Sequence, residues 1–156
     1  MIDCCLPSED FKKRNKILAE IKHHYSKKCV ARFISTHPDQ DHFTGLKEID
    51  KQNTILNFYC VKNEASKEDE TEDFKHYCVL RDNKDKAFYL YRGCERKWMN
   101  ISDSERGCAG LNILWPIPKN INFKNALEIA KNGGSPNNIS PIISYSRKNG
   151  ATALWM

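Results

Sequence analysis

Apolar runs of strand length alternate along this chain with stretches of helical periodicity. The runs that predict strands cover residues 29–35, 54–61, 86–92 and 111–117. The stretches that predict helices cover residues 8–28, 43–51, 63–84 and one or two turns at 126–130. Strands and helices in this alternation predict a mixed α/β fold built in layers.

The first helix should begin near Ser8, a good N-cap, with Glu9 and Asp10 in the first turn, where the helix dipole favours negative charge. Its apolar face is expected from residues at helical spacing: Phe11, Leu18, Ile21 and Tyr25. The adjacent His23 and His24 in the last turn diverge by about 100°. We therefore expect them to interact with the helix dipole, not with a shared metal ion.

The helix predicted at 63–84 should be capped by Ser66 and has an acidic run, 67–73, at its start. The run is typical of a solvated helix start that matches the dipole, although a metal site or a patch that mimics DNA would have a similar composition. The positions expected to share one face are Phe74, Tyr77, Cys78 and Arg81. His76 has no partner at helical spacing, which favours a surface position.

Two further segments have recognisable patterns. Basic and aromatic residues interleave between Gly93 and Gly110, and this composition suits either stacking on nucleic-acid bases or a loop that covers the edge of the core. The residues concerned are Arg92, Arg96, Lys97, Trp98 and Arg106. Near the end of the chain, strands are predicted at 141–146 and 151–156, joined by a hairpin turn at Asn149-Gly150.

The most specific stretch follows the strand at 29–35 and places His37, Asp39, Asp41 and His42 within six residues. Pro38 biases His37 away from helical geometry, so the stretch predicts a tight loop at the end of the strand. Two imidazoles and two carboxylates exceed what one ion needs, which indicates two adjacent divalent ions. Two histidines favour zinc or manganese over magnesium. The alternative without a metal ion is a polar turn that caps the next helix through Asp41 or Thr44.

The spacing resembles the second motif of the metallo-β-lactamase superfamily, His-x-His-x-Asp-His, with Asp39 in place of the second histidine. With the Gly-Leu that follows, the stretch is most similar to the hydrolase domain of ComEC-type DNA-uptake competence proteins. The resemblance implies that His37 and Asp39 hold a first ion and that Asp41 and His42 hold a second. It also implies that Asp41 is catalytic and orients the attacking water.

The resemblance extends beyond this loop. Met1-Ile2-Asp3 is similar to the end of a family strand in which the aspartate ties the site's loops together, so Asp3 is expected to support the site. Cys5 stands where the family has glycine. Residues 137–156 resemble a later family segment, Asn-x-Ser followed by a hairpin. These matches imply an αββα sandwich, and we expect residues 1–156 to form a single, incomplete domain whose remaining ligands lie beyond Met156.

Composition adds limits to this picture. With 40% hydrophobic and 29% charged residues, 156 residues suit one globular domain. The net charge of +5 is compatible with a nucleic-acid or nucleotide substrate, although Lys and Arg are spread along the chain. The seven cysteines form no Cys-x-x-Cys pair and favour reduced thiols in a cytoplasmic protein. No apolar run approaches the roughly 18 residues of a membrane span, so no membrane partner is expected.

The expected function is therefore a metal-dependent hydrolase that uses two divalent ions to cleave a phosphodiester in DNA or a nucleotide. One alternative keeps the fold but has a small ester, thioester or lactam as the substrate. Another is a non-catalytic fragment that contributes a binding surface to a larger assembly.

Overall fold

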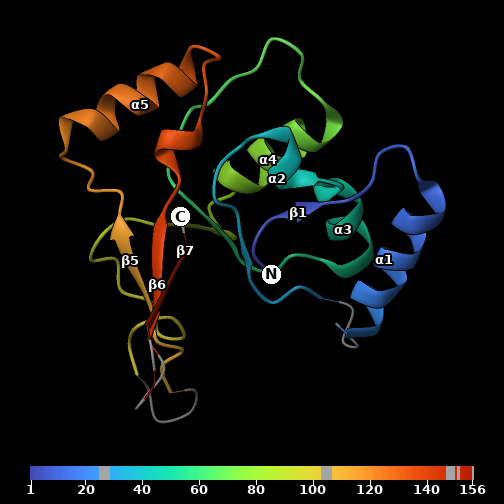
Figure 1. Cartoon of the computed structure of the whole chain (residues 1–156), viewed down its shortest axis with the longest axis horizontal. Coiled ribbons are helices and arrows are strands. Elements are labelled where there is room, and N and C mark those ends of the chain that lie inside the picture. Colours follow the sequence, from blue (N-terminus) through green and yellow to red (C-terminus); the bar gives the residue numbers. More distant parts are fainter. Residues whose placement is uncertain (25–28, 103–106, 147–149, 151, 156) are drawn as a thin grey trace.

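The computed structural model describes the chain except residues 25–28, 103–106, 147–149, 151 and 156 (Figure 1). Its helices are α1 (Phe11–His24), α2 (Gln40–Phe43), α3 (Leu46–Asn53), α4 (Glu72–Asp82), α5 (Ile121–Lys131) and the 3-10 turn η1 (Asn137–Ile139). Its strands are β1 (Cys4–Cys5), β2 (Phe33–Ile34), β3 (Phe58–Cys60), β4 (Ala87–Tyr89), β5 (Leu111–Trp115), β6 (Ile142–Ser146) and β7 (Thr152–Trp155). The mixed α/β class predicted from the sequence is confirmed.

Two small sheets organise the fold. The first is parallel, with strand order β2-β3-β4, and the second is antiparallel, with order β5-β6-β7. The start of the chain runs beside β2, where Ile2 forms a parallel bridge to Ile34. Because parallel strands end at the same edge of a sheet, the segments after β2, β3 and β4 all leave from one edge.

The parallel sheet is buried on both faces, and the pleat of β3 divides its side chains between two cores. Phe58 and Cys60 point into a core shared with α1, α3 and α4, whereas Tyr59 lies in a core shared with the second sheet and α5. In Figure 1, α1 and α3 lie on one side of the molecule, while β5, β6 and α5 lie on the other. Burial on both faces explains why these strands are continuous apolar runs in the sequence.

Helix α1 begins two residues later than a cap at Ser8 predicts. Its cap is Asp10, whose Oδ1 accepts a hydrogen bond of 2.9 Å from the backbone N–H of Lys13, so the prediction of Ser8 is wrong. Leu18 is buried, whereas Phe11 is 72% exposed and does not belong to the apolar face. Tyr25, predicted on the same face, lies outside the described residues.

The helix predicted at 63–84 is reduced to α4, and residues 61–70 form an irregular connection. Ser66 does not cap it, because its hydroxyl donates to the backbone oxygen of Lys131 at 2.6 Å. The cap is Thr71, which accepts from the N–H of Phe74 at 3.1 Å. Competing polar contacts outside the segment therefore decide where this helix starts. His76 is also not a simple surface residue, since its Nε2 lies 2.9 Å from Oδ2 of Asp50.

The helix predicted at 43–51 is split into α2 and α3 at Gly45, which has φ of 90°. The amino end of α3 does not face the loop, because the N–H groups of Gly45 and Lys47 donate to the carboxylate of Asp73 at 2.8 and 2.9 Å. Helix α3 is thus anchored on α4, and only α2 belongs to the loop.

In the C-terminal half, the observed helices and strands agree more closely with those predicted from the sequence. Helix α5 is longer than predicted because Asn120 caps it, accepting from the N–H groups of Asn122 and Phe123. Strands β6 and β7 pair antiparallel as a hairpin. The turn predicted at Asn149-Gly150 lies partly outside the described residues. Trp98, from the basic and aromatic segment, packs against the second core and donates to Tyr59 Oη at 2.6 Å, which favours a core-covering loop.

All seven cysteines are free thiols, as expected for reduced cysteines. None of the helices formed by the described residues has both the length and the apolar character that crossing a membrane requires.

Candidate metal centre

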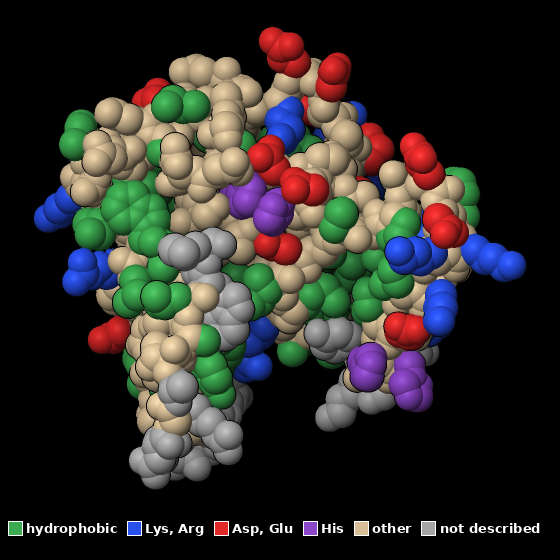
Figure 2. All heavy atoms as spheres, viewed as in Figure 1, with side chains coloured by type: hydrophobic (Ala, Val, Ile, Leu, Met, Phe, Trp, Pro, Cys, Tyr) green, Lys and Arg blue, Asp and Glu red, His purple; other side chains and the backbone are tan. Residues whose placement is uncertain are grey.

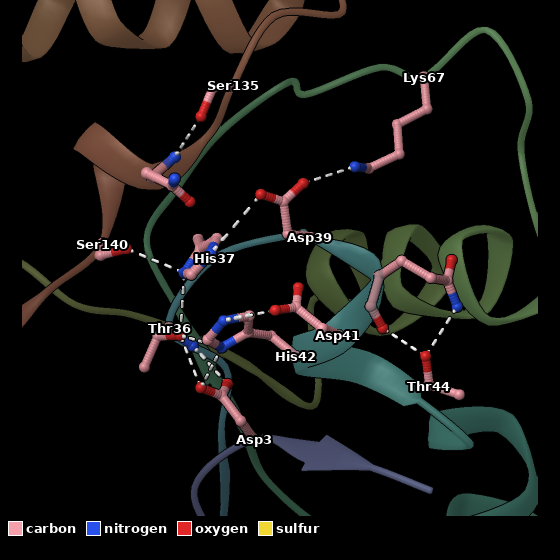
Figure 3. A network of polar contacts seen from close by, with 12 residues as sticks. Asp3, Thr36, His37, Asp39, Asp41, His42, Thr44, Lys67, Ser135 and Ser140 are labelled. Atoms are coloured by element: carbon pink, nitrogen blue, oxygen red, sulfur yellow. Dashed lines mark hydrogen bonds and ion pairs between the residues drawn. The ribbon is translucent and has the colours of Figure 1, made fainter. Parts of the chain in front are cut away.

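The loop that follows β2 brings all four predicted ligands to one place (Figure 3). His37 lies in the extended segment directly after the strand, Asp39 precedes α2, and α2 carries Asp41 and His42. The two imidazole rings are adjacent, with centroids 4.0 Å apart. Figure 2 shows a pair of histidine side chains bordered by carboxylates in the middle of this face of the molecule.

Each histidine faces one of the two carboxylates. His37 Nε2 lies 3.8 Å from Asp39 Oδ2, and His42 Nε2 lies 3.6 Å from Asp41 Oδ2. Both distances are too long for a hydrogen bond. The loop therefore presents two imidazole–carboxylate pairs, side by side.

The other nitrogen of His42 is held by Asp3. Its Nδ1 lies 2.9 Å from Asp3 Oδ2. The same carboxylate accepts from the backbone N–H of Thr36 at 2.8 Å and from the Thr36 hydroxyl at 2.6 Å. Asp3 thus joins the first segment of the chain to the ligand loop, and its support of a metal site stays a prediction.

The other nitrogen of His37 is held by two hydroxyl groups. Its Nδ1 lies 3.0 Å from Ser140 Oγ and 3.1 Å from Thr36 Oγ1. Ser140 comes from the turn before β6, 103 residues away in the sequence. The second sheet therefore helps to orient a residue of the loop that follows the first.

These contacts define the protonation pattern of the rings. An ionised carboxylate can only accept, so the Asp3 contact places the proton of His42 on Nδ1. The Thr36 hydroxyl gives its hydrogen to Asp3, which leaves its oxygen to accept from Nδ1 of His37. In a ring that is neutral and protonated on Nδ1, the lone pair of Nε2 faces a carboxylate oxygen. Two acceptors in that arrangement repel each other unless a cation lies between them.

The surroundings keep His37 neutral. Burial lowers the pKa of His37 below its ordinary value, and the neighbouring His42 lowers it further, although Asp39, Asp3 and Asp41 act in the opposite direction. Neutral imidazole is the form that binds metal ions. The thiol of Cys4, in the segment after Asp3, is different: burial, followed by the charges of Asp73 and Asp3, raises its pKa to about 12. A protonated thiol is a poor ligand.

Each imidazole–carboxylate separation is compatible with one divalent ion between the two groups. Two ligands that each lie about 2.0–2.2 Å from one ion can be up to about 4.0–4.4 Å apart, and both imidazole–carboxylate separations fall within that span. No three His, Cys, Asp or Glu side chains in the described parts of the chain converge on one point. Each ion would therefore take one histidine and one aspartate from this loop, with water or other groups at its remaining positions.

Lys67 is a member of the site that sequence reasoning missed. Its Nζ lies 2.8 Å from Asp39 Oδ1, the oxygen opposite the one that faces His37. Nothing in the local pattern marks it, because it lies in the connection before α4 that was predicted to be helical. Ser140 could have been found from the Asn-x-Ser stretch, and Thr36 from its place in the motif.

Two hollows lie near the carboxyl edge of the parallel sheet. One, of about 690 Å³, is bordered by Ser8, Asp39, Asp41, Lys67 and Thr71, and we call it the ligand groove. The other, of about 460 Å³, lies between the segments after β3 and β4 and α5. The remaining histidines take no part: His23 and His24 are exposed at the end of α1, and His76 pairs with Asp50.

Comparisons with known proteins were made by sequence and by structure. A scan against protein-family models, a search of curated proteins and a search of solved structures each gave no match.

Proposed function

We propose that this chain belongs to a metal-dependent hydrolase with a metallo-β-lactamase-like αββα arrangement, and that its substrate is a phosphodiester in DNA or a nucleotide. The observation that carries the proposal is the pair of imidazole–carboxylate contacts, His37 with Asp39 and His42 with Asp41, in which Nε2 and a carboxylate oxygen lie 3.8 and 3.6 Å apart. The pairs correspond to the two ion positions that the motif implies.

The layers of the fold support the proposal. Helices α1, α3 and α4 cover one face of the parallel sheet, and the second sheet with α5 covers the other. The ligand loop leaves the carboxyl end of β2, the edge at which open α/β sheets commonly place their ligands. The motif with aspartate at position 39 resembles that of the competence proteins, which favours a phosphodiester.

Zinc or manganese ions in such a site would supply a nucleophile at neutral pH and stabilise charge on the phosphate oxygens. His37 and Asp39 would hold one ion, and His42 and Asp41 the other. Asp3 and Ser140 hold the rings with their Nε2 atoms toward the carboxylates. Asp41, whose side chain is 76% exposed, also has room to accept a proton from an attacking water.

The test combines metal content with cleavage. The protein is loaded with manganese or zinc, its metal content is determined by elemental analysis, and cleavage of a single-stranded DNA oligonucleotide is followed. We expect bound metal and cleavage in the wild type and loss of cleavage in Asp41→Asn. An exposed residue on another part of the surface provides the control, Asp85→Asn.

Three outcomes would contradict the proposed function or favour one of its alternatives. Wild-type cleavage no faster than that of Asp41→Asn would contradict phosphodiester hydrolysis at this site. Turnover of a small ester, thioester or lactam without DNA cleavage would instead support the second candidate substrate class. A protein that binds neither metal nor substrate would support the non-catalytic alternative.

A further inference from the structure

Lys67 is bound to the site through one oxygen of Asp39 and also borders the ligand groove. Its side chain is 26% exposed, and its Nζ lies 2.8 Å from Asp39 Oδ1. A lysine ammonium carries three N–H donors, and within the described part of the chain Asp39 is its sole partner. Two donors therefore remain available to a molecule in the groove.

The other charged residues at the groove have the opposite sign. Asp39 and Asp41 both border it, and Lys67 is the one cationic side chain among the described residues there. Without ions, this charge balance would repel an anion. With divalent ions between the imidazole–carboxylate pairs, Lys67 would add a further positive charge beside them and so favour an anionic substrate.

We propose that Lys67 is a substrate-binding residue that contacts a non-bridging oxygen of a phosphodiester in the ligand groove. The inference rests on the proposed function. It identifies the residue that would distinguish a phosphodiester substrate from a small ester, thioester or lactam. A phosphodiester carries a negative charge that an ammonium can bind directly, whereas a neutral ester or lactam does not. Lys67 thus selects charged substrates.

Binding of substrate by Lys67 can be tested separately from any effect of Lys67 on the position of Asp39 (Figure 3). Lys67 approaches Asp39 from the end of the carboxylate away from His37, along the segment that leads to α4. A neutral side chain of similar length, as in Lys67→Met, removes the ammonium and leaves Asp39 Oδ2 facing His37. Lys67→Arg keeps the charge and should restore binding. Lys47 is a matched control because it is exposed, pairs with Glu72 and lies outside the groove.

The experiment measures binding of a phosphorothioate dinucleotide, which resists hydrolysis, to manganese-loaded wild type, Lys67→Met, Lys67→Arg and Lys47→Met by isothermal titration calorimetry. Metal content is determined for each variant. A charge-assisted hydrogen bond of ordinary strength predicts a loss of affinity of about 10- to 100-fold in Lys67→Met alone, with unchanged metal content. Turnover of bis(p-nitrophenyl) phosphate should fall similarly, while turnover of p-nitrophenyl acetate should stay within about threefold.

Affinity within about twofold of the wild type in Lys67→Met would overturn the inference, because a contact worth a charge-assisted hydrogen bond could not then exist. Loss of metal in parallel with affinity would also overturn it, since Lys67 would then act by holding Asp39. Lys67-dependent binding without any cleavage by the wild type would contradict the proposed function while leaving this role of Lys67 in place. Cleavage of the diester at an unchanged rate in Lys67→Met would support the proposed function and contradict this role of Lys67.

Discussion

The carboxylate of Asp3 and the imidazole of His42 lie 2.9 Å apart, although 39 residues separate them in the sequence. Asp3 adopts a positive φ of 48°, a conformation that aspartate and asparagine tolerate better than most residues. This backbone geometry places its two oxygens against His42 on one side and Thr36 on the other. Asp3 therefore sets the orientation of His42.

Asp3→Asn should weaken metal binding and the fold together. Asparagine keeps the size and the backbone conformation, but its NH₂ group cannot accept a hydrogen bond. Either the N–H of Thr36 or the pair formed by His42 Nδ1 and the Thr36 hydroxyl therefore loses its acceptor. We expect the affinity for zinc and manganese to fall by about 10- to 100-fold and the free energy of unfolding to fall by about 1–3 kcal/mol. Metal titration and urea denaturation measure these effects. Asp10→Asn, at the cap of α1, is the control, and wild-type metal affinity in Asp3→Asn would show that Asp3 does not act on the site.

Asp39→His should change which metal the site prefers. Histidine restores the commoner form of the motif, and imidazole is a softer ligand than carboxylate, so the preference for zinc over manganese should rise by about tenfold with the fold retained. Competition titrations of the two metals measure the ratio. Asp85→His adds an imidazole elsewhere and should leave the ratio unchanged. The same ratio in Asp39→His and the wild type would exclude Asp39 as a direct ligand.

Gly45→Ala should destabilise the fold more than the same change at Gly93. Both glycines have a positive φ, 90° and 85°, which costs a residue with a Cβ roughly 1–2 kcal/mol. At Gly45 the added Cβ would also overlap the side chain of Leu6, whereas at Gly93 it would meet nothing within 4 Å. We expect an additional loss of about 1–3 kcal/mol at Gly45. Equal losses of unfolding free energy in urea would contradict the close contact between Leu6 and Gly45.

Asp50 should make the fold sensitive to acid. Burial raises the pKa of Asp50, but hydrogen bonds from His76 and from the N–H of Ile55, together with the charges of Lys86 and His76, outweigh it and leave the pKa below its ordinary value of 3.8. The stabilisation is therefore fully present above that ordinary value. It is lost as the pH falls through the lowered pKa, because the unfolded chain takes up the proton first. Asp50→Asn should reduce the fall in unfolding free energy between about pH 4 and pH 2. Asp85→Asn is the control, and an unchanged slope in Asp50→Asn would refute the linkage.

Local information was enough to predict the loop. Its four predicted ligands lie within six residues, directly after a buried strand, so neighbouring backbone geometry alone brings them together. The alternation of strands and helices was equally local. That the four side chains hold metal remains a prediction.

The start of α4 and the place of Lys67 could not be predicted from the sequence, because both depend on contacts between distant segments. Ser66 and Thr71 are both hydroxyl residues before acidic positions, and either would make a reasonable cap. The choice is made by Lys131, whose backbone oxygen engages Ser66 from α5. The extended connection that results carries Lys67 to Asp39, so the error in the helix boundary also concealed a member of the site.

The hydrogen bond between Ser140 and His37 has a consequence for how the protein is made. A ribosome synthesises the ligand loop about a hundred residues before the serine that orients its first histidine. Contacts of such long sequence separation form late, because the intervening chain must first be ordered. A nascent chain thus displays its imidazoles and carboxylates before Ser140 is in place to orient His37. On the proposed function, discrimination between metals would be a property of the finished molecule, acquired only when β6 docks.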